Sequence, residues 1–171
     1  VENNKPKAIY VAVSDDSNPP YSIFSEKKWN GTKMVETIKK SVDLEDPSVN
    51  AIMSFNIAKN GKKVVLFSVD DSDLEYAFIT KDGSVEFSYP IDSDYTGSDF
   101  IYDEQKDVLL FNNKTTTYKI YGIYNNVYKN QVGIEINTNG VFANLVGTVE
   151  SLEGSLSGLI DIELDNVVVQ E

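Results

Sequence analysis

The amino-acid sequence predicts an all-β fold: an antiparallel β-sandwich or jelly roll with one short helix, or, as the alternative, an up-and-down β-barrel. Three observations lead to this prediction. Apolar and polar residues alternate with a period of two, Asn-Gly or Asp-Gly pairs separate the alternating runs, and three such pairs of runs occur in one short chain. Because the chain has 171 residues and no evident linker, we expect a single β-rich domain over residues 1–171.

Three predicted β-hairpins carry this argument. In each of them, two alternating runs flank an Asn-Gly or Asp-Gly pair. A type I′ turn needs positive φ at both central residues, which these pairs tolerate, so we expect a type I′ turn in each hairpin. The hairpins are residues 51–67 around Asn60-Gly61, residues 76–89 around Asp82-Gly83, and residues 132–143 around Asn139-Gly140.

Further strands and one helix complete the expected elements. Strands are expected at residues 7–14, 108–112 and 115–124, and near the C-terminus. Residues 31–42 differ, because their apolar residues fall near helical spacing after Asn30-Gly31-Thr32, so we expect a short helix across one end of the sheet. The residues with this spacing are Met34, Val35, Ile38 and Val42.

The residue types that are missing exclude several kinds of chemistry. The chain has no cysteine, histidine or arginine, which rules out disulfides, Cys-ligated metals and Ser-His-Asp catalysis. A pair of carboxylates could still hydrolyse a glycoside, and Glu86, Glu135 and Glu163 are the strand residues to consider. Such residues are more often outward-facing and paired with lysine, so we expect the chain not to be an enzyme.

The charge limits the kinds of partner. The net charge is −12 and the pI is about 4.4. Nucleic-acid phosphates and anionic lipids are bound by basic surfaces, so we expect no nucleic-acid partner. We also expect no membrane insertion, because no stretch of about 18 apolar residues occurs. The chain starts at Val1 without a signal-peptide pattern, so a processed or trimmed N-terminus is expected.

An acidic segment at residues 92–99 suggests calcium binding. Carboxylates alternate with small polar residues beside a glycine, and Ca²⁺ prefers oxygen ligands of this kind. The candidate metal ligands are Asp92, Asp94, Asp99 and Asp103. The spacing does not match an EF-hand, and the alternative interpretation is that these residues form solvated turns.

Tyrosines near residue 120 form a candidate ligand-binding surface. On one strand, Tyr118 and Tyr124 would share a face and Tyr121 would lie on the other, so at least one ring should be exposed. An exposed tyrosine can stack on a sugar or contact a protein, although tyrosine also fills ordinary sheet positions. The candidate ligand-binding residues are Tyr118, Tyr121, Tyr124 and Tyr128.

The C-terminal run from residue 156 to residue 164 predicts a half-buried strand. Ile160, Ile162 and Leu164 alternate with acidic residues and are the candidate assembly strand. We expect it to pair with the N-terminal strand at residues 8–13. In the alternative, one of these two strands completes the sheet of a neighbouring subunit.

These observations favour a non-enzymatic structural or adhesive subunit, located outside the cell, on a cell surface or on a virion. Its expected partners are further copies of itself or another surface protein, and its expected cofactor is calcium or none. The alternative function is a β module that binds a glycan or a small ligand.

Overall fold

A computed structural model describes residues 8–13, 20–90 and 99–170, with residues 8–13 described by their backbone. The strands are β1 (Ala8–Val13), β2 (Tyr21–Trp29), β3 (Met34–Val42), β4 (Val49–Asn56), β5 (Lys63–Val69), β6 (Asp73–Ile79), β7 (Val85–Tyr89), β8 (Phe100–Asp103), β9 (Val108–Asn113), β10 (Thr116–Tyr121), β11 (Gly133–Thr138), β12 (Val141–Val146), β13 (Glu153–Gly154) and β14 (Val167–Gln170). Two 3₁₀ helices, η1 (Val149–Ser151) and η2 (Leu156–Leu159), lie between β12 and β14.

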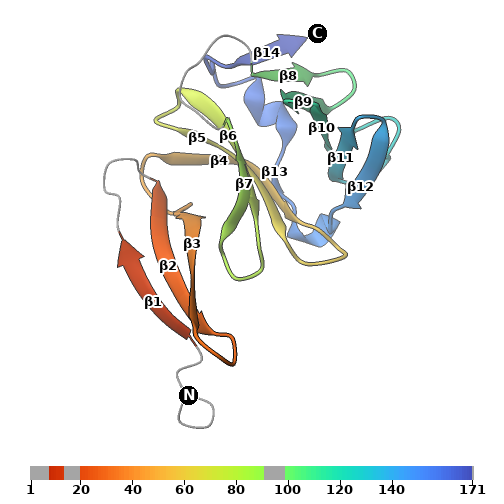
Figure 1. Cartoon of the computed structure of the whole chain (residues 1–171). Helices are drawn as coiled ribbons and strands as arrows, with labels where there is room; N and C mark the ends of the chain where they lie inside the picture. The colour runs from red at the N-terminus through yellow and green to blue at the C-terminus, as the bar shows by residue number, and fades with distance from the viewer. Residues whose placement is uncertain (1–7, 14–19, 91–98, 171) are drawn as a thin grey trace.

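The strands form two stacked sheets, so the predicted β-sandwich is confirmed (Figure 1). The first sheet has the order β1-β2-β3-β7-β6-β5-β4-β13, and the second has the order β12-β11-β10-β9-β8-β14. Neither sheet closes on itself, so the barrel alternative is wrong. In Figure 1, β1, β2 and β3 extend downward from the sandwich; β3 meets β7 only at the Lys40 and Val85 pair.

All three predicted hairpins are present, as the pairs β4–β5, β6–β7 and β11–β12. Their turns differ. The β11–β12 turn is the predicted type I′, since Asn139 and Gly140 both have positive φ, 51° and 85°. In the other two turns only Gly61 and Gly83 have positive φ, 66° and 86°, so type I′ is wrong there. Those loops are longer, and one left-handed glycine after an ordinary turn is enough to close them.

The predicted helix at residues 31–42 is wrong, because this segment forms β3. It pairs with β2 along its whole length, from Tyr21 opposite Val42 to Trp29 opposite Met34. The Asn30 side chain accepts hydrogen bonds from the backbone N–H groups of residues 32 and 33, both at 3.0 Å, and so shapes a hairpin turn. Asn30-Gly31 is therefore another turn signal, and the β-branched residues after it favour a strand.

No helix in the described part of the chain is long and apolar enough to span a membrane.

The prediction for the C-terminus is also wrong. Residues 156–159 form η2, Ile160 is 45% exposed, and neither Ile162 nor Leu164 lies on a strand. The last strand, β14, pairs in parallel with β8, whereas β1 pairs with β2. The physical reason is that the buried leucines of this segment, among them Leu156 and Leu164, fill one side of the core instead of extending a sheet.

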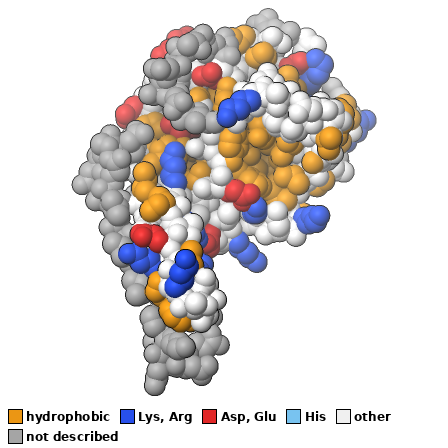
Figure 2. Space-filling model, viewed as in Figure 1, with side chains coloured by type: hydrophobic (Ala, Val, Ile, Leu, Met, Phe, Trp, Pro, Cys, Tyr) orange, Lys and Arg blue, Asp and Glu red, His pale blue; other side chains and the backbone are white. Residues whose placement is uncertain are grey.

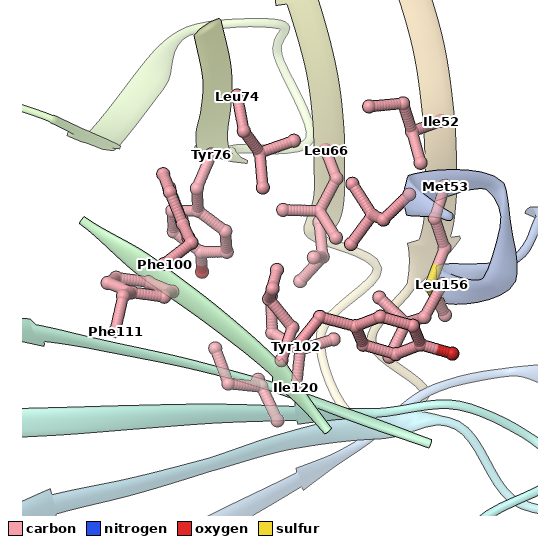
Figure 3. Close-up of a cluster of buried hydrophobic side chains, with 14 of the residues drawn as sticks. Ile52, Met53, Leu66, Leu74, Tyr76, Phe100, Tyr102, Phe111, Ile120 and Leu156 are labelled. Atoms are coloured by element: carbon pink, nitrogen blue, oxygen red, sulfur yellow. The ribbon is translucent and has the colours of Figure 1, made fainter. Parts of the chain in front are cut away.

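The main core lies between the two sheets. Side chains of β4, β5 and β6 meet those of β8, β9 and β10, with Leu156 of η2 at the side (Figure 3). A smaller cluster lies on the opposite face of the first sheet, where Val65 and Phe67 pack against Tyr21 and Val42. This second cluster holds the base of the β2–β3 hairpin against the sandwich.

The turn geometry predicts that Gly61→Val destabilises the protein. A β-branched residue at φ 66° is strained, and a cost of about 1–2 kcal/mol or more is expected. The control is Lys59→Val in the same loop, where φ is not positive and a change within about 0.5 kcal/mol is expected. Urea unfolding measures both variants. Equal stability of the two variants would contradict the assigned turn.

Candidate functional site

The four candidate tyrosines do not form one surface. Tyr118 faces the other sheet and stacks on Phe111 at 4.7 Å and on Phe87 at 5.3 Å between ring centroids. Tyr121 points to the opposite face of β10 and stacks on Tyr128 at 4.3 Å. Tyr124 lies beyond the end of β10, on the loop that leads to β11. The structure therefore brings Tyr121 and Tyr128 together and separates the other two tyrosines from them.

Two half-buried rings, one from each sheet, lie at the margin of the main core. Phe87 of β7 and Tyr118 of β10 are only partly buried, and their rings stack with an interplanar angle of 16°. Figure 2 shows hydrophobic side chains gathered between β7 and the second sheet. Burial raises the pKa of the Tyr118 hydroxyl, which therefore stays neutral at physiological pH. These rings connect the two sheets, which is a packing role.

The outer face of the second sheet carries a polar cluster around Tyr121. This side chain is fully buried beneath Tyr128, and its hydroxyl donates to Oδ1 of Asn144 at 3.0 Å. Gly133 lies opposite Tyr121 in the register, and a Cβ there would overlap the Tyr121 hydroxyl. Lys119 pairs with Glu135 at 2.8 Å.

Glu135 is the charged centre of this cluster. Burial raises its pKa, but the Lys119 ammonium and the Tyr128 hydroxyl outweigh that effect and hold the pKa below its usual value. Glu86 also pairs with a lysine, Lys62. Both glutamates therefore occupy the outward-facing, lysine-paired positions expected of ordinary strand residues, whereas Glu163 is exposed and lies outside the strands.

The loop between β10 and β11 presents two apolar side chains to solvent. Tyr124 is 73% exposed and Val127 is 75% exposed. Two buried side chains fix this loop. Asp107 accepts a hydrogen bond from the Tyr124 backbone N–H at 3.0 Å, and Asn125 Oδ1 accepts from the N–H groups of residues 127 and 128 at 2.9 and 3.0 Å. Burial raises the pKa of Asp107.

The candidate calcium ligands are only partly within the described residues. Asp92 and Asp94 lie outside them. Burial raises the pKa of Asp99, although a hydrogen bond from Asn166 opposes this effect. Asp103 is engaged with Lys106, whose backbone N–H donates to it at 3.0 Å. Residues 8–13, 20–90 and 99–170 contain no group of three candidate ligands, and calcium binding stays a prediction.

One strand at a sheet edge exposes two large apolar side chains. β12 has the sequence VFANLV, without a charged residue or a proline, and it pairs with β11 on one side. Val141 is 73% exposed and Phe142 is 75% exposed. Edge strands in soluble proteins usually carry charges, prolines or bulges that prevent pairing with another chain. We call residues 141–145 of this strand the open edge.

The hydrogen-bond pattern of β12 shows which groups the open edge presents. In a hairpin with a two-residue loop, the flanking residues Thr138 and Val141 form a hydrogen-bonded pair. The next residue, Phe142, and every second residue after it therefore point their backbone N–H and C=O groups outward, away from β11. These outward residues are Phe142, Asn144 and Val146. The Val146 carbonyl accepts a hydrogen bond from Ala58 N–H at 3.0 Å, as this pattern requires. Within the described part of the chain, the outward N–H and C=O groups of Phe142 and Asn144 have no protein partner.

Sequence reasoning identified β12 as a strand but missed its position at the edge. The strand carries no charge, but neither do the edge strands β1 and β14 or the inner strands β4 and β9, so composition alone does not mark an edge. The side chains of β1 lie outside the description, and β14 has only four residues.

Comparison with known proteins gives no match to a family model, a curated protein or a solved structure.

Because the folded state raises the pKa of Asp107, its contribution to stability is present below the ordinary pKa of 3.8 and is lost as the pH rises through the folded value. Asp107→Asn removes this titration and leaves an oxygen for the Tyr124 N–H. The free energy of unfolding of the variant, relative to that of the wild type, should therefore increase from pH 3 to pH 7. Urea unfolding at several pH values measures this trend.

The control for this trend is Asp46→Asn. Hydrogen bonds from Ser48 lower the pKa of Asp46, so this carboxylate stabilises the fold above its ordinary pKa of 3.8. The variant should lose stability relative to the wild type over the same pH range. A rising trend in both variants would contradict the assigned role of burial at Asp107.

The calcium prediction is tested by thermal unfolding with and without calcium. Calcium should raise the melting temperature, because only the folded chain gathers the ligands. The triple variant Asp92→Asn, Asp94→Asn, Asp99→Asn should lose this rise. The control removes the same charge elsewhere, at Asp161, Glu163 and Asp165, and should keep it. A titration without heat or a melting shift would rule out the site.

Proposed function

We propose that this chain is a non-enzymatic structural or adhesive subunit that associates through strand addition at the open edge of β12. The observation that supports this proposal most is an uncharged edge strand with two strongly exposed apolar side chains, Val141 and Phe142. Main-chain hydrogen bonds supply affinity in strand addition, and adjacent side chains supply specificity. Its proposed location is extracellular, on a cell surface or on a virion, and its partners are further copies or another surface protein.

The distribution of charge supports association at this place. Proteins that carry a large net charge repel one another, so contact is least costly where the surface is neutral. The open edge is neutral, and Glu135, which lies opposite Asn144 in the register, is neutralised by Lys119. The missing histidine, cysteine and arginine and the lysine-paired glutamates agree with a role without catalysis.

The exposed Tyr124 favours a second function, a module that binds a glycan or a small ligand. Its ring stands on a loop held by Asp107 and Asn125, beside the exposed Val127. An exposed aromatic ring on a loop whose backbone is hydrogen-bonded is suited to stacking on a sugar. In this proposal the chain acts as a monomer and the open edge is incidental.

Sedimentation velocity over a range from about 1 µM to about 1 mM distinguishes the two functions. The first predicts concentration-dependent association of the wild type, and Phe142→Lys should abolish it without changing the melting temperature, since the side chain is exposed. The control, Thr117→Lys, places the same charge on β10 inside the sheet and should still associate. A wild type that stays monomeric and binds to a glycan array would contradict the first function and support the second.

A further inference from the structure

We propose that the partner at the open edge is a second copy of this chain, paired antiparallel to itself about a two-fold axis at Ala143. This inference rests on the proposed function and specifies its partner. In the resulting dimer, the second sheets of both copies join into one continuous sheet. Such an interface is isologous, because the same strand contributes from both sides.

The backbone groups select this register. Phe142 and Asn144 point their N–H and C=O groups outward, and Val146 is already bonded to Ala58. With the axis at Ala143, Phe142 of each copy faces Asn144 of the other. All four outward groups of these two residues then find partners. An axis at Phe142 or Asn144 would leave outward groups unpaired or would need the occupied Val146 carbonyl.

The side chains also fit this register. Val141 faces Leu145 of the other copy, Phe142 faces Asn144, and the small Ala143 faces itself, so no charged side chains oppose one another. This matters because both partners carry a net charge of −12, and a charged edge would place like charges together. A different acidic surface protein would need a similarly neutral edge, whereas a second copy provides one with no further requirement.

The short ladder implies a weak dimer. The open edge has five residues, and interfaces that bury less than about 1,200 Å² are typical of transient complexes. We therefore expect dimerisation that depends on concentration. Pairing about a two-fold axis closes the assembly at two copies, so a larger assembly would need another edge, such as β14.

Ala143→Cys tests the register directly, because the chain has no cysteine of its own. In the proposed dimer the two Ala143 residues form a non-hydrogen-bonded pair with Cα atoms about 4.5 Å apart, which a disulfide can bridge. With oxidised glutathione as the oxidant, a covalent dimer should form at least about tenfold faster than in the control Thr117→Cys, which is exposed on β10 but away from the edge. Adding Phe142→Lys should remove this difference.

The outcomes separate this inference from the proposed function. Faster cross-linking at residue 143, lost with Phe142→Lys, supports the two-fold dimer. A wild type that associates in sedimentation while Ala143→Cys cross-links no faster than Thr117→Cys overturns the dimer and leaves the proposed function. A monomeric wild type without preferential cross-linking overturns both. Circular dichroism and melting temperatures matching the wild type show that the variants are folded.

Discussion

Packing between the inner faces of the two sheets is the interaction on which the rest of this structure depends. Tyr76, Phe111 and Tyr118 form a continuous set of ring contacts that joins β6, β9 and β10 across the sandwich. Burial of such large rings dominates the stability of a core and dictates which face of each strand points inward. Once one face of each strand points inward, the residues of the other face, including Tyr121, lie on the outer face of the second sheet.

The edges of the sandwich differ in whether their backbone groups are hydrogen-bonded within the protein. On one side, the buried Asn166 side chain accepts from the Leu74 N–H at 2.7 Å and donates to the Leu74 carbonyl at 3.0 Å, which ties the segment before β14 to β6. On the other side, Gly147 forms a bridge with Ile57. Next to Gly147 along the chain, the open edge of β12 keeps outward backbone groups without a protein partner in the described residues. The proposed association would satisfy these groups.

Several carboxylates of the described residues are engaged in ion pairs and hydrogen bonds. Two of the three glutamates considered as catalytic, Glu86 and Glu135, are paired with lysines, and Asp107 accepts a hydrogen bond from the Tyr124 backbone. Strongly exposed apolar side chains include Phe142 on the edge and Tyr124 and Val127 on the loop between β10 and β11. Exposed apolar groups on rigid elements are suited to contact with another molecule.

The sequence by itself determined the elements that depend on near neighbours. Alternation and turn pairs such as Asn139-Gly140 specified the three hairpins, because a hairpin needs only local pattern and backbone freedom. Tertiary structure decided that residues 34–42 pair with β2 as a strand, that η2 fills the core, and that the tyrosines divide between two faces. It also placed β12 at an edge. These features depend on contacts between distant segments, and one strand's periodicity does not show which partner lies beside it.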